Sequence, residues 1–234
     1  MLNEGLEVLG VDERTLGSPY HRGVFEGSGL KRVRLPSTLK RIEFSVFLRC
    51  SQLQTIRFPN GLEYIGTWCF GETGLERVEF PASLRTVAQE AFSECKSLRT
   101  VKFSDGLEVL GTSGYQRGKS TDHGVFQGSA LEAVRLPSTL RRIEYNAFRS
   151  CRNLKHIALP ERLEYIGAFC FCESALESLV VPPSVREIED GAFCDCRALR
   201  EVKFSEGIKT IKQGVFMRTA IECLQLPSSL RRIA

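Results

Sequence analysis

The stretch that decides the fold is Leu136–Pro160, which reads LPSTLRRIEYNAFRSCRNLKHIALP. A near copy of its opening, LPSTLKRIEF, occupies Leu35–Phe44 and begins 101 residues earlier in the chain. Hydrophobic residues recur throughout both copies, but one such stretch is too short to bury its hydrophobic stripe without neighbours. The repetition therefore predicts an array of stacked units.

The repeat extends along almost the whole chain of 234 residues. Starting at Asn3, the sequence divides into nine units plus a C-terminal stub, with starts near residues 3, 36, 59, 81, 104, 137, 160, 182, 205 and 227. An anchor Phe recurs in the same place in each unit, at Phe25, Phe47, Phe70, Phe92, Phe126, Phe148, Phe171, Phe193 and Phe216. If the units stack, residues 22 or 23 apart become neighbours and the anchor rings form one column.

These units predict one curved, right-handed solenoid domain built mainly from short parallel strands. In Leu75–Phe80 (LERVEF) the hydrophobic residues fit a strand whose alternate side chains point into the core. The segment before each anchor Phe predicts a short helical or 3₁₀ turn that seats the aromatic ring. Mean helix content should therefore be low.

Two unit types alternate, and the residue three places after the anchor Phe distinguishes them. One type has Cys there, at Cys50, Cys95, Cys151 and Cys196, whereas the other has Ser28, Thr73, Ser129, Ser174 and Thr219. A metal site would not survive the loss of every second ligand. We therefore interpret this column as small polar side chains that satisfy backbone groups inside a stacked turn. The 101-residue period is a duplicated block of four units.

The quoted stretch resembles the BspA-like leucine-rich repeat family, whose repeat is close to LP-x-x-[LV]-x-x-I-x-x-x-A-F-x-x-C-x-x-L-x-x-[IV]-x-[IL]. The resemblance covers nearly the whole chain apart from two insertions. It implies a leucine-rich-repeat solenoid that serves protein–protein contact or surface adhesion and has no common catalytic site.

Composition and charge narrow the possible cellular locations of the protein. The net charge of +4 is mild, no hydrophobic run approaches the ~20 residues that cross a bilayer, and MLNEGLEVLG does not resemble a secretory signal. The nine cysteines include no CxxC pair, so we expect mostly free thiols in an intracellular setting, with the cell surface as the alternative. Cys172 and Cys194 follow anchor Phe residues in adjacent units, and the sequence leaves open whether they pair.

A row of charges of alternating sign follows the first Leu of successive units. It comprises Glu7, Lys40, Glu63, Arg85, Glu108, Arg141, Glu164 and Arg186, before Lys209 and Arg231. Stacking would place opposite charges side by side, and would place Arg41 against Tyr64 and Arg142 against Tyr165 for cation–π contact. We interpret the row as structural.

The outward positions of the predicted strands give the candidate partner-binding face. Its N-terminal half is basic, whereas Ala158 and Val180 form a hydrophobic spot further on. Either this is a docking surface for an acidic protein or peptide, or it is an ordinary solvated sheet face. Few aromatic residues interleave with these charges, which disfavours nucleic acid. The candidate residues are Arg32, Arg34, Arg57, Arg77, Lys102, Arg135, His156 and Val180.

Two insertions interrupt the repeat at equivalent positions of two units, at about residues 10–23 and 111–124. They are rich in Gly, Ser and Asp and carry Tyr20, His21, Tyr115 and His123, so they are candidate contact points on one edge. The alternative is that the duplication copied a loop without function.

We expect no catalysis, no cofactor, no metal and no small-molecule substrate. The segment GYQRGKS (Gly114–Ser120) is one residue short of a phosphate-binding loop, and the histidines are too scattered for a triad. The predicted function is a non-catalytic protein-interaction or scaffolding module. The alternatives are a secreted or cell-surface adhesin and the recognition arm of a larger enzyme. Neither end carries a distinctive capping motif, so we expect further repeats beyond this sequence or partners that cover its ends.

Overall fold

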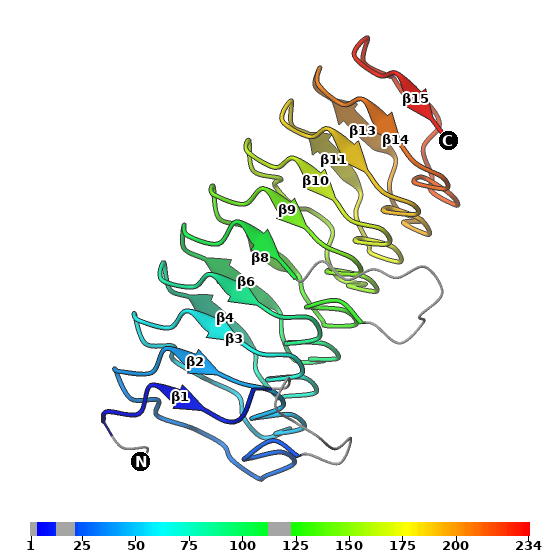
Figure 1. Cartoon of the computed structure of the whole chain (residues 1–234). Helices are drawn as coiled ribbons and strands as arrows, with labels where there is room; N and C mark the ends of the chain where they lie inside the picture. The colour runs from blue at the N-terminus through cyan, green and yellow to red at the C-terminus, as the bar shows by residue number, and fades with distance from the viewer. Residues whose placement is uncertain (1–3, 13–21, 112–122) are drawn as a thin grey trace.

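The structure is a computed structural model that describes residues 4–12, 22–111 and 123–234. Successive units stack in chain order into one elongated β-solenoid, with the two termini at opposite ends (Figure 1). All strand pairs between described residues are parallel, as the repeat predicts. The stacking prediction is therefore confirmed.

The strands form two rows along the solenoid. The first row consists of two-residue strands in two sheets, with orders β1-β2-β3-β5 and β7-β9-β10-β12-β14-β15. These strands are β1 (Val8–Leu9), β2 (Arg41–Ile42), β3 (Tyr64–Ile65), β5 (Thr86–Val87), β7 (Val109–Leu110), β9 (Arg142–Ile143), β10 (Tyr165–Ile166), β12 (Glu187–Ile188), β14 (Thr210–Ile211) and β15 (Arg232–Ile233). The sequence does not predict this row, because two residues are too few to show an alternating pattern.

The second row is the one that the sequence predicts. It contains β4 (Arg77–Phe80), β6 (Thr100–Phe103), β8 (Ala133–Arg135), β11 (Ser178–Val181) and β13 (Glu201–Phe204), in sheets of order β4-β6-β8 and β11-β13. In β4 the side chains of Val78 and Phe80 are buried, whereas those of Arg77 and Glu79 are exposed. This alternation is typical of strands with one face on a core.

The anchor Phe residues form the predicted column through the middle of the solenoid. From Phe25 to Phe216, each ring stacks on the next with centroids 5.1–5.8 Å apart. A shorter second column contains Phe58, Phe80 and Phe103. Aromatic stacking adds to the stabilisation from hydrophobic burial, so these columns contribute to core stability together with the buried Leu, Ile and Val residues.

The turns that seat these rings correct one prediction. The described residues contain no helix, so the expected helical or 3₁₀ turns are wrong. Each turn instead uses left-handed backbone conformations, as at Glu90 (φ 61°) and Glu94 (φ 57°). The amide of Phe70 donates to the carbonyl oxygen of Ala91 in the next unit, at 2.8 Å. The turns also contain bonds between residues three apart, such as that from the amide of Gly71 to the carbonyl oxygen of Trp68 at 3.2 Å, but the left-handed residues stop these bonds from continuing into a helix.

The Cys, Ser and Thr column has the structural role that the sequence analysis assigned to it. Cys95 Sγ donates to the carbonyl oxygen of Phe70 at 3.1 Å and lies 3.4 Å from the hydroxyl of Thr73. Equivalent bonds join Cys50 to Phe25, Cys151 to Phe126 and Cys196 to Phe171. Each thiol therefore ties one turn to the preceding turn.

Candidate functional site

The candidate site is the outward side of the second strand row, which we call the strand face. Strand pairing aligns Glu79 with Lys102, Lys102 with Arg135, and Val180 with Lys203. Towards the N-terminus, a bridge between Arg32 and Thr55 continues the row. The structure places all eight candidate residues of this face at exposed positions: Arg32, Arg34, Arg57, Arg77, Lys102, Arg135, His156 and Val180.

Two adjoining hollows lie on the basic half of the strand face. The larger, of about 640 Å³, is lined in part by Arg34, Arg57 and Phe58. The other, of about 580 Å³, lies where β4 meets the preceding unit and is lined by Arg57, Arg77 and Lys102 among others. Phe58 lines both hollows and is only partly buried, so it forms a hydrophobic floor between the cations.

The four cations that line these hollows lie close together on one face. Within the described residues, Arg34, Arg57, Arg77 and Lys102 form no ion pair. Arg99 on the same block pairs with Glu132, and on the second block Lys155 pairs with Glu177 and Lys203 with Glu201, whereas Lys31, Arg32 and Arg135 also form no ion pair among the described residues. Among the described residues, the basic half of the strand face therefore carries more cations than the acidic groups there pair with.

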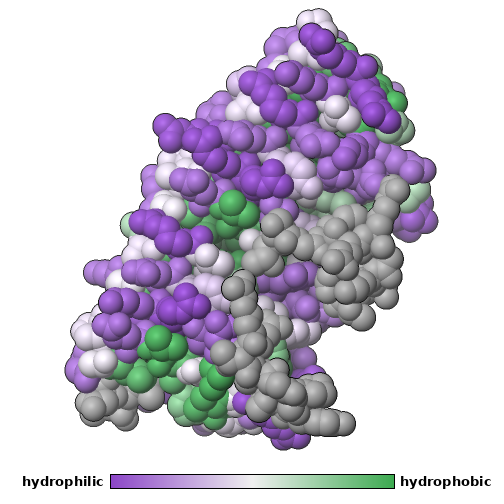
Figure 2. All heavy atoms as spheres, viewed as in Figure 1, coloured by the Kyte–Doolittle hydropathy of each residue, from purple (hydrophilic) through white to green (hydrophobic). Residues whose placement is uncertain are grey.

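The predicted hydrophobic spot is present further along the same face. Val180 on β11 is 60% exposed, and Ala158 in the preceding unit is also exposed. A third hollow, of about 580 Å³, lies at the C-terminal end and is lined by Lys203, Phe204 and Cys223 among others. Over the side shown in Figure 2, the surface is largely hydrophilic with small hydrophobic patches.

Of the candidate residues on the insertions, Tyr20, His21 and Tyr115 lie outside the described residues. His123 is described and is 40% exposed at its side chain. Its Nδ1 lies 3.3 Å from Oε2 of Glu90, and its ring meets that of Trp68 edge-on at 6.0 Å. The end of the second insertion therefore packs against the two preceding units.

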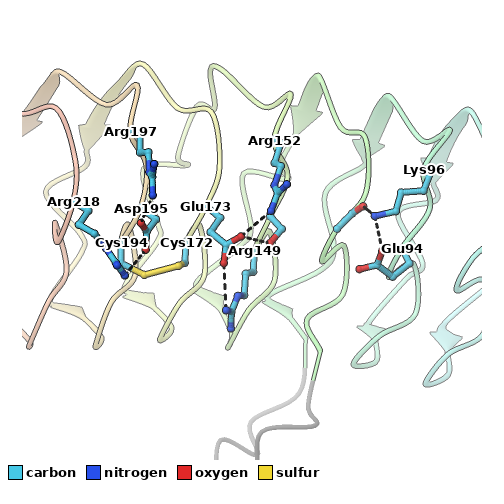
Figure 3. Close-up of polar contacts among 12 residues, drawn as sticks. Glu94, Lys96, Arg149, Arg152, Cys172, Glu173, Cys194, Asp195, Arg197 and Arg218 are labelled. Atoms are coloured by element: carbon cyan, nitrogen blue, oxygen red, sulfur yellow. Dashed lines mark hydrogen bonds and ion pairs between the residues drawn. A yellow bond between two sulfur atoms is a disulfide. The ribbon is translucent and has the colours of Figure 1, made fainter.

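The turns carry a charged cluster that the sequence analysis missed (Figure 3). Glu173 accepts hydrogen bonds from Arg152 at 3.1 Å and Arg149 at 3.4 Å, and Asp195 pairs with Arg218 at 2.8 Å. Burial raises the pKa of Glu173, but the hydrogen bonds from Arg152, Ser150 and Arg149 outweigh it, so the net pKa is lowered. The recurrence of acidic residues two places after the anchor Phe, at Glu72, Glu94, Glu173 and Asp195, is the signal that would have revealed it.

Beside this cluster, Cys172 and Cys194 form a disulfide between neighbouring units, with Cα atoms 4.7 Å apart (Figure 3). The sequence left this pairing open. Among the described residues, Cys172, Cys194 and Asp195 are the only group that gathers three potential metal-ligating atoms. Because the disulfide joins the two sulfur atoms, the group does not act as a metal site in this state.

The predicted charge row is confirmed in part. Lys40 pairs with Glu7 and Arg141 with Glu164, whereas Arg85 donates instead to the carbonyl oxygen of Gly106 and Arg186 to that of Gly207. Both predicted cation–π contacts are confirmed: Arg41 lies 4.0 Å from the ring centroid of Tyr64, and Arg142 lies 3.9 Å from that of Tyr165. These contacts lie along the first strand row, whose strands are paired by backbone hydrogen bonds.

The repeat pattern and the stacked architecture agree with a known family. A model of the BspA type leucine rich repeat region, with 6 copies, matches residues 21–121 and 119–234. The chain belongs to the BspA-type leucine-rich repeat family. Comparison with curated proteins finds no match.

Solved structures of other leucine-rich repeat proteins share the fold. A leucine-rich repeat protein from Bacteroides ovatus aligns with a TM-score of 0.64 and 21% identity, over 89% of this chain and 70% of that chain. The T. pallidum leucine rich repeat protein aligns with a TM-score of 0.52 and 31% identity, over 61% and 65%. A leucine rich cell surface protein from Faecalibacterium prausnitzii aligns with a TM-score of 0.52 and 22% identity, over 86% and 60%.

The chain thus spans 60–70% of the length of these three proteins. In the part of the chain that the structure describes, no helix has the length and hydrophobicity to cross a bilayer.

Proposed function

We propose that this chain is a non-catalytic protein-interaction module that binds its partner through the strand face. The observation that carries the proposal is the pair of adjoining hollows, whose four exposed cations form no ion pair within the described residues. The stacked units hold these side chains at fixed spacing before a partner arrives. Little ordering entropy would therefore oppose binding.

Crosslinking mass spectrometry of the native protein tests this proposal. Lys31 and Lys102 lie on or beside the strand face and supply reactive amines. We expect them to crosslink to the partner, and we expect the variant Arg34→Glu/Arg57→Glu/Arg135→Glu to lose those crosslinks. The control Arg162→Glu/Arg231→Glu changes exposed arginines outside the hollows. Equal crosslinking by the two variants would exclude the strand face as the binding surface.

The two insertions are proposed as a second contact, through Tyr20, His21 and Tyr115. Their support is their equivalent position in the two duplicated blocks. Deleting residues 13–21 and 112–122 should leave the melting temperature nearly unchanged and reduce partner binding. Loss of the fold in the deletion variant would assign the insertions a structural role instead.

A cell-surface adhesin is the second candidate function, and two observations favour it. The Cys172–Cys194 disulfide is typical of an oxidising environment, and the similar protein from Faecalibacterium prausnitzii is described as a cell surface protein. Surface biotinylation of intact cells that express the full-length gene would test it. Labelling above that of a cytoplasmic marker supports the adhesin, and labelling equal to the marker opposes it.

A further inference from the structure

We infer that the two adjoining hollows take an acidic peptide segment in an extended conformation, with one hydrophobic side chain seated on Phe58. This inference rests on the proposed function and specifies the partner's chemistry. The hollows share Arg57 and Phe58, so one continuous segment is able to occupy both.

The charge of the hollows favours an acidic partner. Four cations line them, and the acidic side chains among the lining residues are Glu4 and Glu79. Glu4 is already engaged, because it accepts hydrogen bonds from the amide and hydroxyl of Ser37 at 3.2 and 2.9 Å. The surplus positive charge lies in a concave site, where the field on a bound carboxylate is stronger than on a flat surface.

The spacing of the cations favours an extended segment. Arg34, Arg57 and Lys102 lie in the first, second and fourth units of the array, and each step between stacked units is ~4.8 Å. The row from Arg34 to Lys102 therefore covers ~14 Å, which an extended peptide spans with about four or five residues. Alternate side chains of such a peptide face the same way, so two or three acidic residues meet the cations.

The partly exposed ring of Phe58 favours a partner segment that contains one hydrophobic side chain. Phe58 is partly exposed and stacks on Phe80 with centroids 5.6 Å apart, so its position is fixed by the core. Val33 and Pro59 line one hollow beside it, and Pro81 lines the other. A leucine side chain of the partner would bury hydrophobic surface on this floor.

The second block provides an internal control for this site. The positions 101 residues after Arg57 and Arg77 are Ala158 and Ser178, so the equivalent surface of the second block lacks both guanidinium groups. Glu79 corresponds to Val180, which removes the acidic group as well. The first block should therefore bind an acidic segment and the second should not.

The test uses a fluorescein-labelled eight-residue peptide with a central Leu flanked by Asp and Glu, with binding measured by fluorescence anisotropy at physiological salt. Losing two charged contacts should weaken binding of the Arg57→Ala/Arg77→Ala variant about tenfold. Arg57→Lys/Arg77→Lys should retain most of the affinity, and Arg162→Ala/Arg231→Ala should retain all of it. Replacing the central Leu of the peptide by Ser should weaken binding without changing the protein.

Three results would overturn the inference. The first is equal binding of a peptide whose Asp and Glu are replaced by Asn and Gln. The second is tighter binding of an eight-nucleotide oligothymidylate than of the acidic peptide. The third is unchanged peptide binding by the Arg57→Ala/Arg77→Ala variant.

If the acidic peptide fails to bind while the charge reversals still abolish crosslinks to the native partner, the strand face remains the binding surface and only the acidic segment is excluded. If the peptide binds through Arg57 and Arg77 while the charge reversals leave the native crosslinks intact, the site is acid-specific and the proposed partner surface is wrong.

Discussion

The two duplicated blocks agree along the anchor Phe column and in the first strand row, but differ in the second ring column, where Phe58 and Phe80 correspond to Leu159 and Val181, and on the strand face. Phe70 and Phe171 are 101 residues apart and occupy the same place in the ring column, with the next ring at 5.1 and 5.3 Å. The interactions of Arg41 are repeated at Arg142, which contacts an equivalent Glu at 2.8 Å and an equivalent Tyr at 3.9 Å. Packing against both neighbouring units fixes these residues, because a change in volume would disturb three units.

The strand face has no such constraint, and there the blocks have diverged. Arg57 and Arg77 of the first block correspond to Ala158 and Ser178 of the second. The blocks differ on the turns as well, because the disulfided Cys172 and Cys194 correspond to Gly71 and Ser93. The stacked core thus sets the architecture, and the exposed residues are where any partner preference is encoded.

The largest loss of stability should come from truncating an anchor Phe, a position at which the two blocks are equivalent. Phe70→Ala and Phe171→Ala each remove a fully buried ring and should lower the free energy of unfolding by about 3–5 kcal/mol. Urea denaturation followed by circular dichroism measures both. A loss below about 1 kcal/mol for either variant would show that its ring is not part of a continuous packed column.

The disulfide should make the second block respond to reduction. It closes a loop of 22 residues, and opening such a loop should lower the stability by about 3 kcal/mol. Hydrogen exchange with and without dithiothreitol should show lost protection around residues 171–196, whereas the first block, with Gly71 and Ser93, should be unaffected. The Cys172→Ser/Cys194→Ser variant is the control and should no longer respond to reductant.

Two equivalent thiols of the column, Cys95 and Cys196, should make the fold labile at high pH. Burial raises the pKa of Cys95 to about 11 and that of its equivalent, Cys196, to about 11. Because the folded state holds these protons more tightly than the unfolded state, the stabilisation is complete below pH 9 and is lost as the pH rises from 9 towards 11. Each such thiol should contribute a loss of about 2–3 kcal/mol over that range.

Denaturation midpoints at pH 8, 9 and 10 measure this loss. The Cys95→Ala and Cys196→Ala variants should each show a shallower pH slope than the parent. At pH 8, iodoacetamide should label the exposed Cys223 and leave the buried thiols Cys95 and Cys196 unmodified. An unchanged slope in both variants would mean that these thiols do not set the alkaline limit of stability.

The smallest effect on stability should come from exchanging the strand faces. Arg57→Ala/Arg77→Ser gives the first block the residues of the second, and Ala158→Arg/Ser178→Arg does the reverse. Because all four positions are exposed, each change should alter the free energy of unfolding by less than about 0.5 kcal/mol. Binding of the acidic peptide should fall in the first variant and increase in the second. A large loss of stability would mean that the strand face is structural.

The sequence by itself determined the repeat, the Phe column, the parallel stacking and the outward direction of residues such as Arg57 and Val180. It did so because a fixed period brings the same position of each unit to the same place in the array, whatever the details of the turn. It also gave the structural role of thiols such as Cys95, since a column that alternates with Ser and Thr suits hydrogen bonding inside a turn.

Only the tertiary structure decided which charges are neutralised and which are not. Spacing in the sequence placed Arg85 and Glu63 in neighbouring units, yet Arg85 bonds to the carbonyl oxygen of Gly106. The tertiary structure likewise decided the pairing of Cys172 with Cys194, the left-handed turns and the lack of ion pairs, among the described residues, for the cations beside Phe58. These features depend on side-chain direction and on distances of a few ångströms between units, which the repeat period does not fix.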